Sequence, residues 1–193
     1  WATSGPRIQL RFFGGWDMKD IDPAKVDWVK SAYEKGTSMG GTLNSTGIPE
    51  GISSPTFVVA ALKDADSANL DRIQIVKGWS VKRESHEKIY NVALSDNRKV
   101  DPATGKAPPI GDTVNLETLE YATDKGASQL TAVWTDPDFD AAQNAFYYAR
   151  VLEIPTPRWS SFDAKELGIP VPEDLHKTIQ ERAYSSPIWY DNK

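Results

Sequence analysis

The sequence predicts a mainly β protein, an immunoglobulin-like β-sandwich with long loops and a few short helices. About seven or eight short segments have the alternation or the β-branched composition of strands, and Gly- and Pro-rich turns separate them. Two of these segments, 70–77 and 87–94, are joined by a polar connection over 80–87. Antiparallel strands can be joined in this way, whereas parallel strands need a crossover of about a dozen residues or more. The pair therefore predicts antiparallel strands at the centre of the fold.

The first segments combine one strand with one helix. Residues 7–12 alternate, with Ile8, Leu10 and Phe12 on one face, which predicts a half-buried strand. Asp22 and Pro23 have the residue types of a helix start, and apolar residues at helical spacing continue to Gly36. The Gly-, Ser-, Thr- and Pro-rich stretch 37–55 predicts a long loop.

Further strands are predicted in the middle and at the end of the chain. Residues 56–62 are almost all apolar, which predicts a central strand covered on both faces. Strands are also expected over 113–121, 129–134, 145–153 and 183–190. Pro187 favours an edge position for the last of these. Short helical segments are expected over 136–144, 163–167 and 173–180.

Composition excludes several classes of function. The net charge of −5 speaks against nucleic-acid binding by bulk electrostatics, and no apolar run is long enough for a membrane span. The 193 residues include no cysteine, which rules out disulfides, zinc–thiolate sites and thiol nucleophiles. Because the chain begins at Trp1, close to a predicted strand, we expect a fragment, a processed product or a trimmed chain.

Polar motifs give little support for catalysis by this chain alone. His86 and His176 lack any paired-ligand spacing and are expected at the surface, as are Glu34, Glu50, Asp64 and Asp71. Asp136, Asp138 and Asp140 resemble the start of a calcium loop. Ala141 and Tyr147 replace the Gly and Glu that such a loop requires, so the acidic start of a helical turn explains them more simply. No catalytic or metal-ligating set is therefore assigned, and no cofactor is expected in this chain.

Tryptophans are the most conspicuous residues without an assigned role. Six of them could form a carbohydrate platform, namely Trp16, Trp28, Trp79, Trp134, Trp159 and Trp189. Aromatic residues serve more often in cores and interfaces. Because Trp16, Trp79 and Trp159 stand at strand ends or in loops, we interpret them as interface candidates, and Lys77 and Gly78 join Trp79 as a possible interface rim.

Several short sequence motifs, in this order along the chain, support a family resemblance: ATSGPRI (2–8), RFFGGW (11–16), MGG (39–41), RIQIVKGW (72–79), YYARVLEIP (147–155) and QERAYSSPIWY (180–190). Together they resemble the C-terminal part of an uncharacterised bacterial family. That family looks like the metal-dependent hydrolases of the polymerase-and-histidinol-phosphatase type, in the wider amidohydrolase-like group, and is similar to the carbaryl hydrolase family. The resemblance covers nearly all of the chain.

The resemblance implies a domain plan. Residues 1–6 would be the end of a preceding barrel or its junction, and residues 7–193 an accessory β-sandwich packed on that catalytic barrel. The barrel would hold the divalent metal, since the family's early histidine-rich motif and late Asp-x-His motif are both missing here. Thr3, Ser4, Gly5 and Arg7 are then candidates for the junction or the active-site mouth. Export signals in such families imply a periplasmic or secreted protein. A carbohydrate- or surface-binding module and a stand-alone hydrolase are the alternatives.

Overall fold

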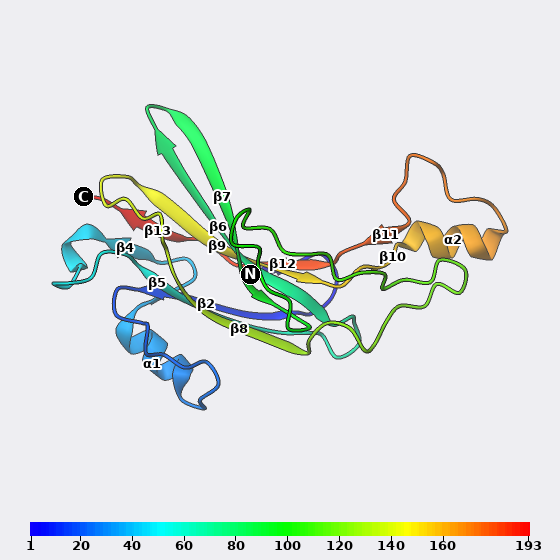
Figure 1. Ribbon diagram of the computed structural model, residues 1–193, viewed down its shortest axis with the longest axis horizontal. Coiled ribbons are helices and arrows are strands. Elements are labelled where there is room, and N and C mark those ends of the chain that lie inside the picture. Colours follow the sequence, from blue (N-terminus) through cyan, green and yellow to red (C-terminus); the bar gives the residue numbers. More distant parts are fainter.

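Two β-sheets packed face to face form the body of the protein (Figure 1). The computed structural model describes residues 1–46 and 48–193 in full. The larger sheet contains β1 (Ala2–Thr3), β4 (Thr42–Asn44), β6 (Leu70–Val81), β7 (Glu84–Leu94), β9 (Ala145–Glu153), β12 (Arg182–Tyr184) and β13 (Ile188–Asp191). The smaller sheet contains β2 (Gln9–Gly15), β3 (Thr37–Ser38), β5 (Thr56–Leu62) and β8 (Gln129–Thr135). The prediction of a mainly β sandwich is confirmed.

The hairpin β6–β7 is longer than the sequence predicts. Residues 80–87, expected as a polar connection, continue both strands, and only Lys82 and Arg83 form the turn. Both turn residues have positive φ, 50° and 71°, as two-residue hairpins require at their centre. The strands are polar here because the end of the hairpin projects beyond the sandwich, where neither face packs on the body (Figure 1).

Strand β9 lies in the middle of the larger sheet, and not the hairpin β6–β7 as predicted, since β7 pairs only with β6. It pairs with β6 on one side and with both β12 and β13 on the other. The single edge strand predicted over 183–190 is therefore wrong, since β13 also pairs in parallel with β4. Pro187 lies between β12 and β13, where its missing N–H interrupts no ladder. In this gap Ser185 Oγ accepts the Ala149 N–H at 2.9 Å.

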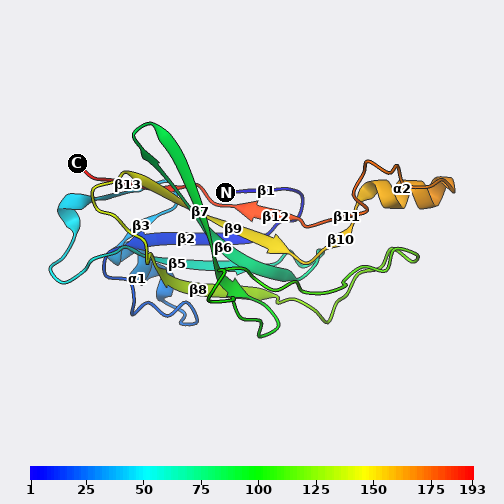
Figure 2. The same cartoon turned by 45° about the horizontal axis from the view of Figure 1, so that its top comes forward.

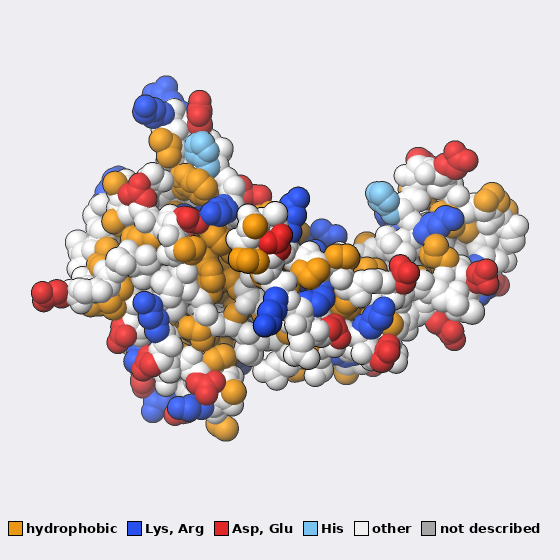
Figure 3. All heavy atoms as spheres, in the orientation of Figure 1, with side chains coloured by type: hydrophobic (Ala, Val, Ile, Leu, Met, Phe, Trp, Pro, Cys, Tyr) orange, Lys and Arg blue, Asp and Glu red, His pale blue; other side chains and the backbone are white. Residues whose placement is uncertain are grey.

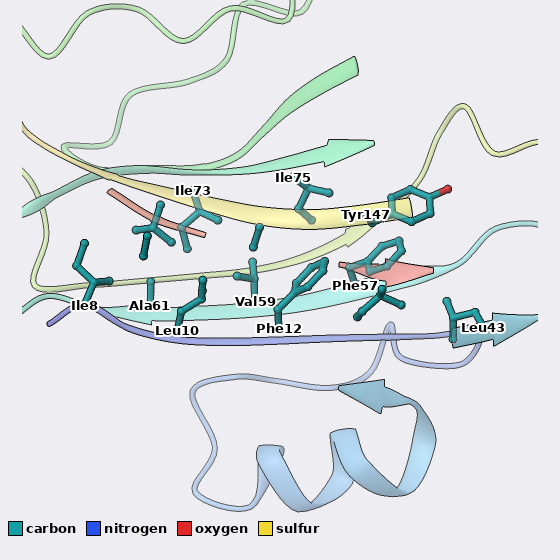
Figure 4. Close-up of a cluster of buried hydrophobic side chains, with 14 of the residues drawn as sticks. Ile8, Leu10, Phe12, Leu43, Phe57, Val59, Ala61, Ile73, Ile75 and Tyr147 are labelled. Carbon is teal, nitrogen blue, oxygen red and sulfur yellow. The ribbon is translucent and has the colours of Figure 1, made fainter. Parts of the chain in front are cut away.

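The main core fills the space between the two sheets (Figure 4). Ile8, Leu10 and Phe12 from the β2 side and Phe57, Val59 and Ala61 from β5 face Ile73, Ile75 and Tyr147 of the larger sheet. The alternation in the sequence correctly predicts which residues of β2 point inward. The apolar run of β5 is nearly continuous because both of its faces are covered.

Helix α1 (Trp28–Lys35) covers the outer face of the smaller sheet (Figure 1). A second cluster joins Phe13 and Val58 from the sheet with Met18, Ile21 and Ala32. The helix begins later than predicted, because the carboxylate of Asp22 accepts the Ala24 N–H and forms a local turn instead.

A narrow arm extends from one end of the sandwich (Figure 2). It consists of helix α2 (Trp159–Leu167) and the two short strands β10 (Thr156–Pro157) and β11 (Thr178–Ile179). Helix α2 begins four residues before the predicted 163–167. The helices predicted over 136–144 and 173–180 do not form, and 113–121 contributes one isolated bridge, Val114–Tyr121, rather than a strand. The predicted loop 37–55 also holds β3, β4 and the 3-10 turn η1 (Ser45–Gly47). No helix within the described residues has the length and apolar character needed to cross a membrane.

Candidate functional site

The N-terminal segment is fixed on the edge of the larger sheet. Strand β1 pairs with β12, so that Thr3 lies opposite Ala183. Ser4 continues this contact: its N–H donates to the Arg182 carbonyl at 3.0 Å, and its Oγ accepts the Arg182 N–H at 2.9 Å and donates to the Glu181 carboxylate. The junction candidates Thr3, Ser4 and Gly5 are therefore held side by side, and all three are exposed.

Arg7 secures the other end of the same segment. Its backbone N–H donates to the Asp64 carboxylate at 2.7 Å, its Nε donates to that carboxylate at 3.1 Å, and its Nη2 reaches Asp66 at 2.6 Å. The Arg7 backbone N–H, followed by the Arg7 side chain, lowers the pKa of Asp64 to about 2. Asp64, expected at the surface, is only 8% exposed because it caps this segment. Residues 4–7 thus form one rigid wall.

The arm forms the opposite wall of an open groove of about 710 Å³. Ser4, Gly5 and Pro6 line one side, and Trp159 and Phe162 of α2 line the other. The two aromatic rings stand 6.0 Å apart, and their side chains are 80% and 41% exposed. Leu167 and Ile169 at the end of α2 are 69% and 54% exposed. The arm therefore presents these apolar side chains to solvent, and Figure 3 shows a few hydrophobic side chains among charged ones on it.

A buried carboxyl group lies behind this groove. Glu153 at the end of β9 is fully buried, its Oε2 accepts the hydroxyl of Ser67 at 2.8 Å, and Ser67 lines the groove. Within the described residues Oε1 of Glu153 has no hydrogen-bond partner. Burial raises the pKa of Glu153 to about 7, and the hydrogen bond from Ser67 opposes that rise.

Lys77 belongs to the core and not to an interface rim. Its side chain points between the sheets, and Nζ donates to the Asp136 carboxylate at 2.7 Å and to the Asp138 carbonyl at 2.6 Å. Tyr147 also donates to Asp136, at 2.7 Å. Lys77 is 5% exposed and Asp136 1% exposed. The prediction that Lys77 lies at an interface rim is wrong, because its ammonium group pairs with the buried carboxylate of Asp136.

All three calcium candidates accept hydrogen bonds from protein groups: Asp136 as just described, and Asp138 and Asp140 from other partners. Asp138 accepts hydrogen bonds from Lys88 at 2.5 Å and Tyr90 at 2.6 Å, and Lys88, followed by Tyr90, lowers the pKa of Asp138. Asp140 turns away to bond the Ala142 N–H and the Gln143 amide. Within the described residues no three acidic or histidine side chains converge on a point where a metal ion could bind.

The remaining interface candidates have separate places. Trp16 is 8% exposed and packs edge-on against Phe139 and Tyr190, so it belongs to the core and not, as predicted, to an interface. Gly78 allows a close approach, since a Cβ there would stand 2.2 Å from Cζ of Phe146. Trp79 is half-buried and stacks on His86. Of these three residues, none lines the groove beside the arm.

Of the other residues predicted at the surface, some are exposed and one is buried. His86, His176, Glu34 and Glu50 are exposed as predicted. Asp71 is 1% exposed instead, because Arg72, Arg98 and Gln180 all donate to its carboxylate. Sequence reasoning missed Glu153 and Phe162 entirely. Glu153 ends a strand whose residues are apolar or aromatic apart from Arg150, which is a usable signal for a buried acid, whereas nothing in the sequence marks Phe162 as exposed.

Comparison with known proteins places the chain in one family. The model of a protein family of unknown function, DUF3604, matches residues 1–192. The chain belongs to this family. No curated protein and no solved structure matches it. The DUF3604 match covers both sheets, the arm and the N-terminal segment, so the groove between that segment and the arm lies within the family's own domain.

Proposed function

We propose that this chain is a non-catalytic β-sandwich that packs against a catalytic domain of the same parent protein. The observation that carries the proposal is the exposed apolar arm, above all Trp159 at 80% exposure beside Phe162. Large aromatic side chains left bare on a projecting element are typical of interaction sites, because their burial against a partner releases water from apolar surface.

The opposite wall of the groove supports docking. The bonds of Ser4 to Arg182 and of Arg7 to Asp64 fix residues 4–7 before any partner arrives, so little conformational freedom is lost on binding. Glu181 adds a carboxylate to this wall, whereas the Asp66 carboxylate already pairs with Arg7, and Arg158 adds a cation on the side of the arm. The groove thus offers one partner an apolar wall and a polar wall of mixed charge.

The identity of the partner rests on the resemblance set out above. We propose a preceding barrel of the polymerase-and-histidinol-phosphatase type that holds a divalent metal, in a parent protein exported to the periplasm or the medium. On this view the wall at residues 4–7 lies where the barrel ends, so the candidates Thr3, Ser4 and Gly5 would stand at the domain boundary.

Two experiments test the proposal. The coding region before Trp1 is expected to encode a histidine-rich barrel, and its absence would overturn the identification of the partner. The upstream polypeptide, expressed separately, is then expected to bind the present chain in analytical ultracentrifugation. Because truncation of an aromatic hot spot costs about 2 kcal/mol or more, the double variant Trp159→Ala/Phe162→Ala should bind about 30-fold more weakly.

Trp189→Ala provides the matched control, because it removes an exposed tryptophan, 49% accessible, that does not line the arm groove. It should bind the upstream polypeptide as the unchanged chain does. Equal affinity of the arm variant and the unchanged chain would show that docking does not use the arm.

A further inference from the structure

A second groove lies on the outer face of the larger sheet, at the base of the hairpin β6–β7. Its volume is about 730 Å³, and its floor includes Gly78, Phe146 and Trp189. Figure 3 shows hydrophobic side chains at the base of the projecting hairpin. No residue of this groove lines the groove beside the arm, so the two surfaces are separate.

A row of aromatic rings crosses the strands at this face. Trp189 of β13 lies 5.4 Å from Phe146 of β9, Phe146 lies 6.4 Å from Tyr148, and Tyr148 lies 6.2 Å from Tyr184 of β12. The register explains the row, because Trp189 stands opposite Phe146, and Phe146 and Tyr148 are two residues apart on one face of β9. Helix α1 covers the outer face of the other sheet, whereas Trp189 here is 49% exposed.

Gly78 lets the aromatic ring of Phe146 lie flat on the sheet. It stands directly opposite Phe146 in the β6–β9 register, and any side chain at this position would occupy the place of the ring. The backbone therefore opens a flat, shallow floor in the groove. A flat aromatic floor suits a ligand with a planar apolar face.

The polar rim decides which ligand fits. Glu87 and Asp191 contribute carboxylates, and Ser80, Ser85, Thr42 and Asn144 contribute hydroxyl and amide groups. Of the lining residues none is Lys or Arg. Anionic ligands such as sulfated or uronic polysaccharides would meet these carboxylates with no lysine or arginine in the lining to offset the repulsion.

From this geometry we infer that the hairpin groove binds a neutral glycan chain. Pyranose rings present C–H groups on one face, which pack on aromatic rings, and hydroxyl groups at the edge, which donate to carboxylates. A proline-rich peptide also binds aromatic grooves, but its proline residues have no N–H to donate to the carboxylates of Glu87 and Asp191, whereas every sugar hydroxyl can donate. The inference is independent of docking through the arm.

The test uses the purified chain and soluble neutral glycans. Affinity electrophoresis through β-glucan, xylan, galactomannan and starch, followed by calorimetry with the matching hexasaccharide, is expected to show saturable binding to at least one. Heparin, alginate and a polyproline peptide are expected to give no binding. No binding to any of the neutral glycans, or preferential binding of an anionic polymer or the peptide, would overturn the inference.

Variants locate the site. Trp189→Ala should weaken glycan binding about tenfold or more, because it removes the most exposed ring of the row. Glu87→Gln retains an acceptor oxygen and adds a donor, so it is expected to reduce affinity less than Trp189→Ala. Trp159→Ala on the arm is the matched control and should bind unchanged. Far-UV circular dichroism verifies that each variant is folded, and equal affinities of Trp189→Ala and the unchanged chain would contradict the assignment.

Discussion

Removal of the Lys77 ammonium group should destabilise the fold strongly, because it leaves a buried carboxylate without its counter-charge. Nζ lies 2.7 Å from the Asp136 carboxylate, and both residues are at most 5% exposed. Lys77→Met keeps most of the aliphatic stem but leaves the carboxylate buried with only the Tyr147 hydroxyl as its side-chain donor. Breaking a buried ion pair from one side costs about 3–5 kcal/mol, because the remaining charge loses its compensation in a poorly polarisable surrounding.

The assay is urea unfolding followed by tryptophan fluorescence, with free energies extrapolated to water. A loss of about 3–5 kcal/mol in a chain of this size lowers the melting temperature by roughly 6–20 °C. Lys88→Met is the matched control, since its amine pairs with Asp138 at a similar distance, 2.5 Å, but both side chains are about half exposed. That change should cost about 0–1 kcal/mol.

A double variant separates the lost charge from lost packing. In Lys77→Met/Asp136→Asn the remaining amide is neutral, its oxygen can accept the Asp138 N–H, and its NH2 can donate to the Tyr147 hydroxyl oxygen, so most of the stability should return. If Lys77→Met unfolds within about 1 kcal/mol of the unchanged chain, the buried pair contributes far less than its geometry implies. If the double variant is no more stable than the single one, packing of the stem and not charge explains the loss.

Three further predictions concern packing and protonation. Gly78→Ala should cost about 1–3 kcal/mol in urea unfolding, since its methyl group would overlap the ring that packs over it, whereas Gly5→Ala, with its nearest neighbour 3.8 Å away, should be close to neutral. Trp16→Ala should cost about 3–5 kcal/mol and Trp159→Ala less than about 0.5 kcal/mol in the isolated chain; the reverse order would contradict the burial pattern. Glu153 has a folded pKa of about 7, above the ordinary glutamate value, so the folded state binds more protons than the unfolded state between the two values. Stability should therefore fall as pH rises from about 4.5 to 7, and Glu153→Gln should remove this part of the slope; an unchanged slope in that variant would assign it to another group.

The strands of this protein follow from local pattern. Ile8, Leu10 and Phe12 alternate with polar residues, and this period fixes which face of β2 is buried wherever the strand lies. The apolar run of β5 likewise indicates a strand covered on both faces, which the core on one side and the α1 cluster on the other confirm. Mainly β character and the hairpin β6–β7 were predictable because each depends on neighbours in the chain.

The roles of charged and aromatic side chains depended on residues far apart in the chain. Lys77 and Asp136 are separated by 59 positions, and only the packing of the two sheets places one carboxylate against one ammonium group. The same holds for Trp16 and Trp159, which look alike in sequence and differ tenfold in exposure, 8% against 80%. By itself the sequence determined the location of the longer strands β2, β5, β8 and β9, since their composition and alternation are properties of adjacent residues. Only the tertiary structure decided which polar groups are paired inside and which rings face water, because burial depends on what the rest of the chain places on each surface.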